Sequence, residues 1–219
     1  MLDALGKTGK IAKLDSGQDF RAFQTIEALH RAQLAAGALA QMPAGFLADF
    51  YRYLATRTDC AVFTAEAEGR VAGFVAGTLH ASSLLKSFLL AQPVRTLGYC
   101  ARLLLAPRLF FRIVSLARHL AEGSRETDVD ERQLLSIAVA PGDLHSGVGT
   151  GLFGALCDWF RSRGAEDFGV IAAKTQTAAL HFYRRCGAAE VGETRLGGLS
   201  SIRFRCVLRS DARSSGGTL

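Results

Sequence analysis

The feature that most constrains the fold is a buried strand that runs into a glycine-rich turn and then into a helix. Residues 133–140 form a mostly apolar run that ends at Pro141-Gly142. A helix is predicted over residues 147–163, since its large apolar side chains fall four apart on one face: Val148, Leu152, Leu156 and Phe160. Gly164 is well placed to stop this helix. A strand and a helix joined in this way indicate an α/β architecture.

The remaining sequence predicts the rest of a mixed α/β fold. Helical spacing indicates helices over 18–39 and from Pro43 onward, and two strand-like runs around Gly69-Arg70 indicate a hairpin over 61–79. The other predicted elements are a short strand at 10–15, a strand at 168–173, a helix at 177–186 and strands at 189–194 and 201–208. We expect one central mixed sheet with helices on both faces.

The same order of elements predicts a single domain. It spans residues 1–210, with a Leu-rich helical insertion at about 81–120 that contains Pro93 and Pro107 as breaks. Residues 124–132 are polar and acidic and are expected to form a loop. The last residues, 211–219, are expected to form a disordered tail.

Cysteine usage and the N-terminus indicate where the protein acts. The five cysteines are scattered, odd in number and without a C-x-x-C pair, which favours a reducing cytosol over a disulfide framework or a zinc site. The first ten residues contain no apolar run of the kind that a secretory signal needs. We therefore expect a cytoplasmic protein without a bound metal.

The glycine-rich turn predicts an anion-binding site. Gly147, Gly149 and Gly151 lack side chains that would keep an anion away from the backbone at the start of the helix. The free N–H groups of the first helical turn and the helix dipole both favour negative charge there, so a diphosphate is the natural ligand. The alternative is that these glycines only shape the turn between the strand and the helix.

Two common diphosphate motifs do not fit this turn. A nucleotide P-loop needs a Gly-Lys-Ser/Thr sequence, and the single Gly-Lys-Thr, at Gly6, lacks both the upstream glycine and a preceding strand. A dinucleotide fingerprint matches by letters from Gly149 to Gly154, but its first glycine does not follow the strand directly. The next strand also ends in Ala-Ala-Lys174 rather than in an acidic residue for the ribose.

Residues 134–188 instead resemble the acetyl-CoA-binding core of the GNAT superfamily of N-acetyltransferases. The family's loop pattern, Q/R-x-x-G-x-G/A, aligns with L-H-S-G-V-G at residues 144–149. Its later helix, N-x-x-A-x-x-F/L-Y-x-x-x-G-F, aligns with Q-T-A-A-L-H-F-Y-R-R-C-G-A at residues 176–188. Leu144, Gln176 and Ala188 depart from the usual Gln or Arg, Asn and Phe, but none of these changes removes the backbone groups of the turn.

The resemblance implies that the protein binds acetyl-CoA as a co-substrate. The main chain of the strand before the loop, at Ile137, Ala138 and Val139, is implied to pair with the extended pantetheine arm. The diphosphate is implied to lie on the loop, where the backbone compensates for the missing side-chain contact at the first position. The implied contacts are Leu144, His145, Ser146, Gly147, Val148, Gly149, Thr150 and Gln176.

The resemblance also implies how the transfer is catalysed. Tyr183 occupies the family's position for the general acid that protonates the departing thiolate, and the alternative is a packing tyrosine. The family's usual Glu near the start of the strand is here Gln133, which cannot accept a proton, so Glu131 is our candidate base. His80 and bulk water are alternatives, whereas His181 is expected to be a surface residue.

The insertion at 81–120 carries the whole net charge of +6, because it contains six cations and no Asp or Glu. A basic charge confined to one segment does not indicate nucleic-acid binding. Its arginines and prolines argue against a membrane span. The segment could pack as a lid, line an acceptor pocket for an anionic amine, or, less favoured, form an amphipathic surface helix that touches a membrane. A homodimer is compatible with the sequence.

Three functions are compatible with the resemblance. The first is transfer of an acetyl group from acetyl-CoA to a primary amine of a small molecule, by direct attack of the amine on the thioester. The second is acetylation of a protein amine, which an open groove beside Tyr183 would favour. The third is a CoA-binding sensor without catalysis, which the missing base leaves open.

Overall fold

The residues that the structure describes form one seven-stranded mixed sheet covered by helices. The computed structural model describes residues 10–15, 17, 20–35, 37, 39–104, 131–196 and 199–208. The strands are β1 (Lys10–Lys13), β2 (Cys60–Ala67), β3 (Arg70–Thr78), β4 (Gln133–Val139), β5 (Asp167–Ala173), β6 (Ala189–Leu196) and β7 (Leu199–Val207). Their order across the sheet is β1-β2-β3-β4-β5-β7-β6, and only the β4–β5 pair is parallel. The predicted mixed sheet is confirmed.

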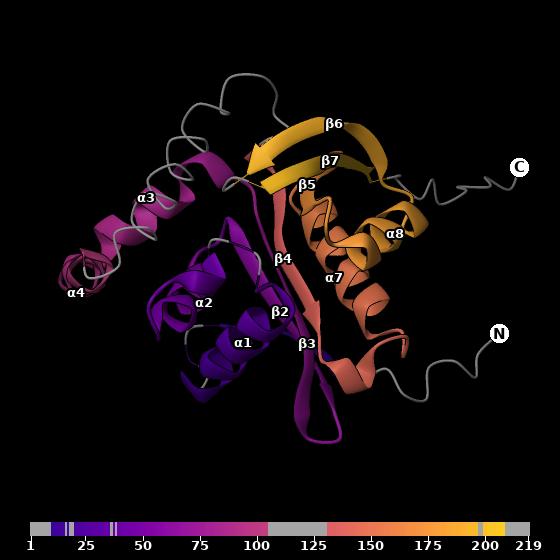
Figure 1. Cartoon of the computed structure of the whole chain (residues 1–219). Coiled ribbons are helices and arrows are strands. Elements are labelled where there is room, and N and C mark those ends of the chain that lie inside the picture. Colours follow the sequence, from indigo (N-terminus) through magenta and orange to yellow (C-terminus); the bar gives the residue numbers. More distant parts are fainter. Residues whose placement is uncertain are drawn as a thin grey trace, which may run out of the picture.

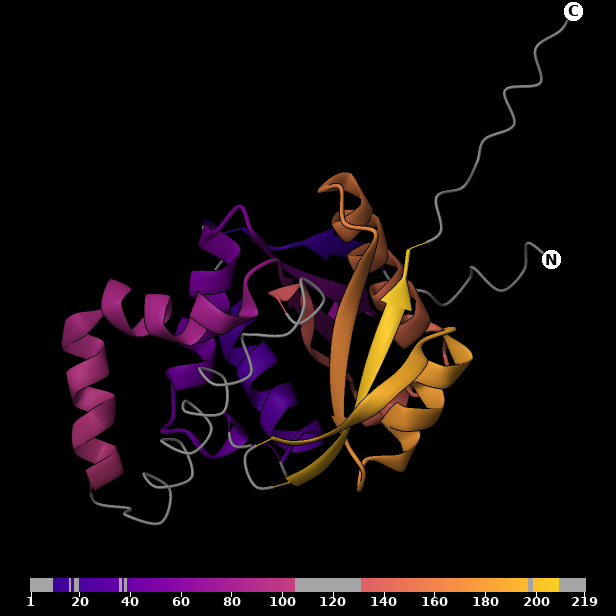
Figure 2. The same cartoon turned by 90° about the horizontal axis from the view of Figure 1, so that it is seen from above.

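Helices cover both faces of this sheet, as the sequence predicts. They are α1 (Phe20–Gln33), α2 (Phe46–Thr56), α3 (Ala81–Ala91), α4 (Pro93–Leu104), α7 (Val148–Ser162) and α8 (Thr177–Arg185), with short 3₁₀ turns η2 (Leu39–Gln41) and η4 (Pro141–Asp143). Figure 1 shows α1 and α2 on one face and α7 and α8 on the other. Figure 2 shows α3 and α4 extending to one side of this body. None of the helices within the described ranges is long and apolar enough to cross a membrane.

Each face of the sheet has its own hydrophobic core. The predicted apolar stripe of α7 is fully buried against the sheet, and its last member, Phe160, stacks on Phe168 of β5 with ring centroids 4.5 Å apart. On the opposite face, Phe23 and Ile26 of α1 pack with α2 over Phe74 of β3. Burying both faces explains why the strands β2 and β3 read as nearly continuous apolar runs.

A buried ion pair fixes α1 to the start of α2. Glu27, on the inner face of α1, accepts hydrogen bonds from the backbone N–H groups of Gly45 (3.0 Å) and Ala48 (3.3 Å). Its carboxylate also pairs with Arg31 one turn later, at 2.7 Å, and Arg31 donates in turn to the carbonyls of Met42 and Pro43. These bonds occupy the free N–H groups at the beginning of α2 and set the position of α1 over the sheet.

Three predicted boundaries differ from the structure by a few residues. The hairpin turn is Glu68-Gly69, not Gly69-Arg70. Glu68 and Gly69 both adopt the positive φ angles that a tight two-residue turn needs. The first helix ends at Gln33, and the second begins at Phe46 rather than at Pro43, with Gly45 in the left-handed region before it. Residues 105–130 and 209–219 lie outside the described residues, so the predicted loop and tail stay predictions.

Two glycines in β3 make room for neighbouring elements. A glycine inside a strand predicts a close neighbour or a bulge. At Gly73, a Cβ atom would stand 2.9 Å from the carbonyl oxygen of Ala138 and 3.0 Å from Leu152 Cδ1. At Gly77, a Cβ atom would stand 2.7 Å from Leu156 Cδ1, and the β3–β4 register also shifts beside this residue. β3 therefore has a close neighbour at Gly73 and a register shift beside Gly77.

We expect Gly73→Ala to destabilise the protein by about 1–3 kcal/mol, because the new methyl group would press on the main chain of β4 as well as on α7. Gly154→Ala is the matched control, since a Cβ at this position within α7 has nothing within 4 Å. The control should gain about 0.5–1 kcal/mol from helix propensity. Urea unfolding midpoints measure both changes, and equal stability of Gly73→Ala and the wild type would contradict the close approach.

The insertion begins as two helices fixed to α2. Arg95 of α4 forms an ion pair with the buried carboxylate of Asp49 on α2, and Tyr99 donates a hydrogen bond to the same carboxylate at 2.6 Å. Burial, and next the nearby Asp49, raise the pKa of Tyr99, which keeps this donor protonated. Arg108, Arg112 and the other residues of the insertion beyond 104 lie outside the described residues, so the predicted lid or surface helix there is not described.

Candidate active site

The sheet opens between its two parallel strands. β4 and β5 pair only at Gln133 with Gly169 and at Leu134 with Val170. Beyond this point β4 stays paired with β3 as far as Val139, while β5 stays paired with β7 as far as Ala173. The edge of β4 that faces β5 therefore has no ladder partner from Leu135 onward, and its main-chain groups are available to another extended chain.

A bulge in β4 lies at the start of this opening. Ala76 of β3 pairs with Ser136, and Gly77 pairs with Leu134, so Leu135 between them has no ladder partner on β3. It has none on β5 either, since that pairing ends at Leu134. A bulge bends its strand and changes the direction of the side chains around it. Leu135 and Ser136 thereby both lie toward the core of α1 and α2.

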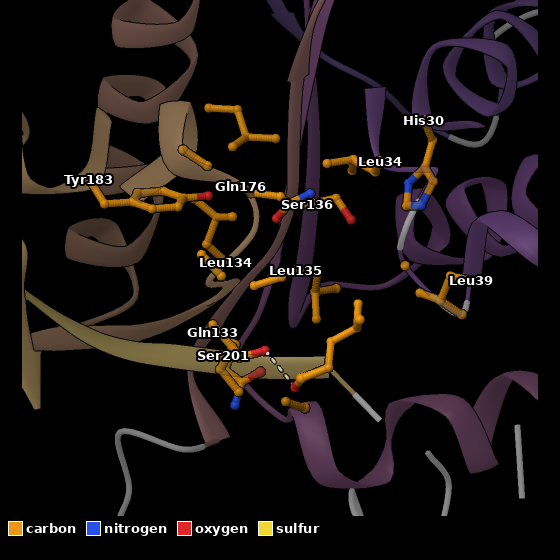
Figure 3. A pocket seen from close by; sticks show the side chains of 18 of the residues that line it. His30, Leu34, Leu39, Gln133, Leu134, Leu135, Ser136, Gln176, Tyr183 and Ser201 are labelled. Carbon is orange, nitrogen blue, oxygen red and sulfur yellow. Dashed lines mark hydrogen bonds between the residues drawn. The ribbon is translucent and has the colours of Figure 1, made fainter. Parts of the chain in front are cut away.

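A cavity of about 240 Å³ occupies the opening. Residues 133–137 of β4 and 171–173 of β5 line its middle. Tyr183 of α8 lines it from one face of the sheet and His30 of α1 from the other, as Figure 3 shows, with Ser136 between them. The cavity therefore connects both faces. Most of its wall is apolar, and the described residues that line it include no Asp, Glu, Lys or Arg.

The turn between β4 and α7 presents unpaired backbone N–H groups. Gly147 precedes the helix in the left-handed region (φ 89°), and His145 also has a positive φ of 65°. The first bond of the helix runs from the Gly151 N–H to the Gly147 carbonyl at 2.9 Å. The N–H groups of residues 148–150 consequently have no partner within the helix, and together with the helix dipole they favour an anion.

An ion pair holds this turn in place. Arg70, at the beginning of β3, contacts the buried carboxylate of Asp143 through both terminal nitrogens, at 2.5 and 3.1 Å. This bond, and the attraction of the carboxylate, raise the pKa of Arg70. The Asp143 carbonyl accepts a hydrogen bond from the Ser146 hydroxyl at 2.5 Å. The negative charge of Asp143 is thus neutralised next to the N–H groups that would receive an anion.

Tyr183 is buried and lies in the cavity wall. Its ring packs among Phe153, Phe182 and Phe204, which fixes the side chain on the inner face of α8. A phenol in water has a pKa near 10, but burial, and less strongly the neighbouring Cys206 and Cys186, raise the pKa of Tyr183 well above that value. The hydroxyl is therefore fully protonated at neutral pH.

The other residues predicted for the site are distributed around this cavity. Ile137 and Gln176 line it, whereas Ala138 and Val139 lie further along the unpaired edge of β4. Leu144 and His145 are exposed on the turn, and Ser146, Val148, Gly149 and Thr150 follow them into α7.

The candidate bases from the sequence lie away from the cavity wall. Glu131 precedes β4 instead of belonging to it, and it does not line the cavity, although Gln133 does. His80 is exposed at the start of α3, and His181 is exposed as predicted. No group of three or more His, Cys, Asp or Glu side chains in the described part of the chain could hold a metal ion.

Sequence reasoning missed a polar group that the structure places in the cavity wall. His30 Nδ1 lies 2.6 Å from the hydroxyl of Tyr51, and Tyr51 is also within hydrogen-bonding reach of the Ser136 side chain. His30 and Ser136 line the cavity, while Tyr51 is fully buried behind them. These residues come from α1, α2 and β4, and no spacing in the sequence connects them.

Comparisons with known proteins agree with this architecture. Residues 112–188 match the model of the acetyltransferase (GNAT) family. No curated protein sequence matches the chain. The fold is similar to a solved acetyltransferase structure, with a TM-score of 0.57 and 18% identity over 92% of this chain and 100% of the other.

Two other solved structures share the fold. The ribosomal-protein-S18-alanine N-acetyltransferase from Escherichia coli has a TM-score of 0.52 and 15% identity over 94% of this chain and 97% of the other. The aminoglycoside 6'-acetyltransferase type Ii has a TM-score of 0.57 and 11% identity over 92% of this chain and 98% of the other. At these identities the similarity shows the fold alone.

Proposed function

We propose that this protein, whose residues 112–188 match the acetyltransferase (GNAT) family, transfers an acetyl group from acetyl-CoA to a primary amine of a small molecule. The observation that carries the proposal is the cavity through the sheet, which follows the unpaired edge of β4 and has Tyr183 in its wall. An acyl donor and an amine can approach this cavity from opposite faces of the sheet. A sensor that only binds CoA would not need the second face.

The backbone around the turn supports acetyl-CoA as the donor. The N–H groups at the start of α7 suit its diphosphate, and the unpaired edge at Ile137, Ala138 and Val139 suits the amides of its pantetheine arm. A diphosphate would contact the turn from Leu144 to Thr150 mainly through main-chain groups. Leu144, which is exposed, stands where the family usually has Gln or Arg. Its side chain is therefore not needed for the main-chain contacts to the diphosphate.

The chemistry requires one proton to leave the amine and one to reach the sulfur. The amine nitrogen attacks the thioester carbonyl carbon, the C–N bond forms and the C–S bond breaks. Tyr183 gives its hydroxyl proton to the leaving thiolate, and its raised pKa means that it still carries this proton at neutral pH. Leu135, which has no ladder partner on either side, offers main-chain groups to the carbonyl oxygen.

The cavity wall favours an amine with an apolar body. On the side of α1 and α3 the wall is formed mainly by Leu34, Leu39, Leu84 and Leu85. The described cations of the insertion, Lys86, Arg95 and Arg102, do not line the cavity, and Arg95 is paired with Asp49. The anionic acceptor predicted from the sequence therefore depends on the three arginines beyond residue 104.

Binding of acetyl-CoA tests the donor site. Gly149→Glu should weaken acetyl-CoA binding by at least about 100-fold, because it adds bulk and a negative charge beside the N–H groups that would receive the diphosphate. Gly149→Ala is the control, since a Cβ here meets only ordinary contacts, with Val139 at 3.5 Å and Phe182 at 3.6 Å. Isothermal calorimetry with acetyl-CoA measures both variants, and undiminished binding by Gly149→Glu would contradict the assignment.

A further inference from the structure

The predicted bases lie outside the cavity, yet the reaction needs a group that removes a proton from the amine. His30 is the imidazole in the cavity wall, on the face opposite Tyr183 (Figure 3). We propose that His30 is the catalytic base, that its Nε2 accepts the proton of the acceptor amine, and that Tyr51 and Ser136 position it. This assignment rests on the proposed acetyltransferase function and adds the residue that the sequence does not reveal.

The free nitrogen of His30 borders the cavity. Nδ1 is occupied by the hydroxyl of Tyr51 at 2.6 Å, while Nε2 makes no hydrogen bond to the described residues. Among the described residues, one side-chain nitrogen or oxygen is both fully enclosed and without a hydrogen-bond partner, and this atom is Trp159 Nε1, not His30 Nε2. Nε2 is therefore not fully enclosed, although His30 as a whole is only 3% exposed. The open space that His30 borders is the cavity.

The hydrogen bonds behind His30 can fix the tautomer that a base needs. When Nδ1 carries the imidazole proton, it donates this proton to the Tyr51 hydroxyl oxygen. The lone pair is then on Nε2 and faces the cavity. Phe74 stacks on the imidazole with ring planes 24° apart and holds its orientation. Burial raises the pKa of Tyr51, so this positioning hydroxyl stays protonated.

His30 is also in the right protonation state. Burial, and secondly the positive charge of Arg31, lower the pKa of His30 to about 4. The imidazole is therefore neutral at pH 7 and can accept a proton at any time. Arg31 belongs to the same helix, and Tyr51 of α2 is the polar group that contacts the ring from another element. A neutral imidazole can take the proton that the amine nitrogen releases as its bond to carbon forms.

The protons balance over one turnover. The C–N bond forms as the amine nitrogen loses a proton to His30 Nε2, and the C–S bond breaks as Tyr183 gives its hydroxyl proton to the sulfur. The products are the amide and CoA thiol, with His30 positively charged and Tyr183 negatively charged. Loss of the proton from His30 to solvent, and uptake of one by Tyr183, restore both groups without any other reactant.

The proposal is tested with 2-phenylethylamine, a primary amine with an apolar body, and saturating acetyl-CoA. His30→Gln should lower kcat by about 100-fold or more, the effect expected of a lost general base, while the affinity for acetyl-CoA measured by calorimetry stays unchanged. Tyr51→Phe leaves the imidazole but removes its partner, and it should lower kcat about 10-fold. His181→Gln, at the exposed histidine of α8, is the matched control and should keep the wild-type kcat.

Chemical rescue separates proton transfer from a purely structural role. In His30→Ala, added imidazole should restore turnover, and a series of methylated and halogenated imidazoles should do so in the order of their basicity. Rescue that follows the size of the imidazole and not its basicity would overturn the proposal, as would full turnover by His30→Gln. Failure of the wild-type protein to acetylate the amine, despite binding acetyl-CoA, would instead contradict the proposed function and with it the role of His30.

Discussion

Replacing Tyr183 by Phe is expected to lower kcat by about 100- to 10,000-fold, the range found when a general acid is lost. The change removes only the hydroxyl, so the ring should keep its contacts with Phe153, Phe182 and Phe204. The KM for acetyl-CoA should change little, because the hydrogen bond to sulfur strengthens only as the thiolate forms.

Steady-state kinetics, together with a pre-steady-state measurement that shows chemistry to be rate-limiting, checks this result. Tyr53→Phe is the control, since the Tyr53 hydroxyl accepts a hydrogen bond from Arg57 and Tyr53 does not line the cavity. It should behave like the wild type. Unchanged kcat in Tyr183→Phe would reduce Tyr183 to a packing residue in the core of α7 and α8.

The free energy of unfolding is expected to fall by about 3 kcal/mol between pH 6.5 and pH 4 through His30 alone. The pKa of His30 is about 4 in the folded protein, compared with 6.5 for an ordinary histidine. In this interval the unfolded chain binds a proton at His30 that the folded protein does not bind. Stability therefore rises with pH across this interval and is lost progressively as the pH falls.

Urea unfolding at a series of pH values measures this effect. His30→Gln should remove the contribution of His30, so the difference in unfolding free energy between wild type and variant should itself change by about 3 kcal/mol between pH 6.5 and pH 4. His181→Gln, at an exposed position, should give a curve parallel to the wild type. A parallel curve for His30→Gln would show that His30 is not buried as a neutral imidazole.

The elements of the fold could be predicted because their signals are local. Apolar side chains four apart along residues 148–160 predict α7, and this stripe is the one that packs on the sheet. Gly147 and Gly164 predict where that helix begins and ends, and both adopt the positive φ that favours glycine. Each of these signals depends on the chain within one or two helical turns, which the sequence records directly.

The interior of the candidate site could not be predicted, because it depends on which elements meet. The opening of the sheet is set by the separate partners of β4 and β5, and the bulge at Leu135 is visible only in the β3–β4 register. His30 and Tyr51 are 21 residues apart on two helices, so neither residue marks the other in the sequence. The family motif points to the loop and to Tyr183, but it contains no position for His30 or Tyr51.

The charge of the insertion shows the same limit. Six cations without an acidic residue suggest a surface prepared for an anion, yet Arg95 pairs with Asp49, which lies 46 residues earlier on α2. Asp49, which neutralises this arginine, lies outside the insertion at 81–120. Regional charge therefore predicts a field at long range, but it does not predict which charges stay available to a ligand.

A crystal structure of the protein with acetyl-CoA bound would show directly whether the opening between β4 and β5 holds the acyl donor. We expect the diphosphate on the N–H groups at the start of α7, the pantetheine arm along the edge of β4 at Ile137 to Val139, and the thioester sulfur within hydrogen-bonding distance of the Tyr183 hydroxyl. His30 Nε2 should face the carbonyl carbon from the opposite side of the sheet. Acetyl-CoA bound elsewhere, with the opening between β4 and β5 empty, would contradict the proposed function.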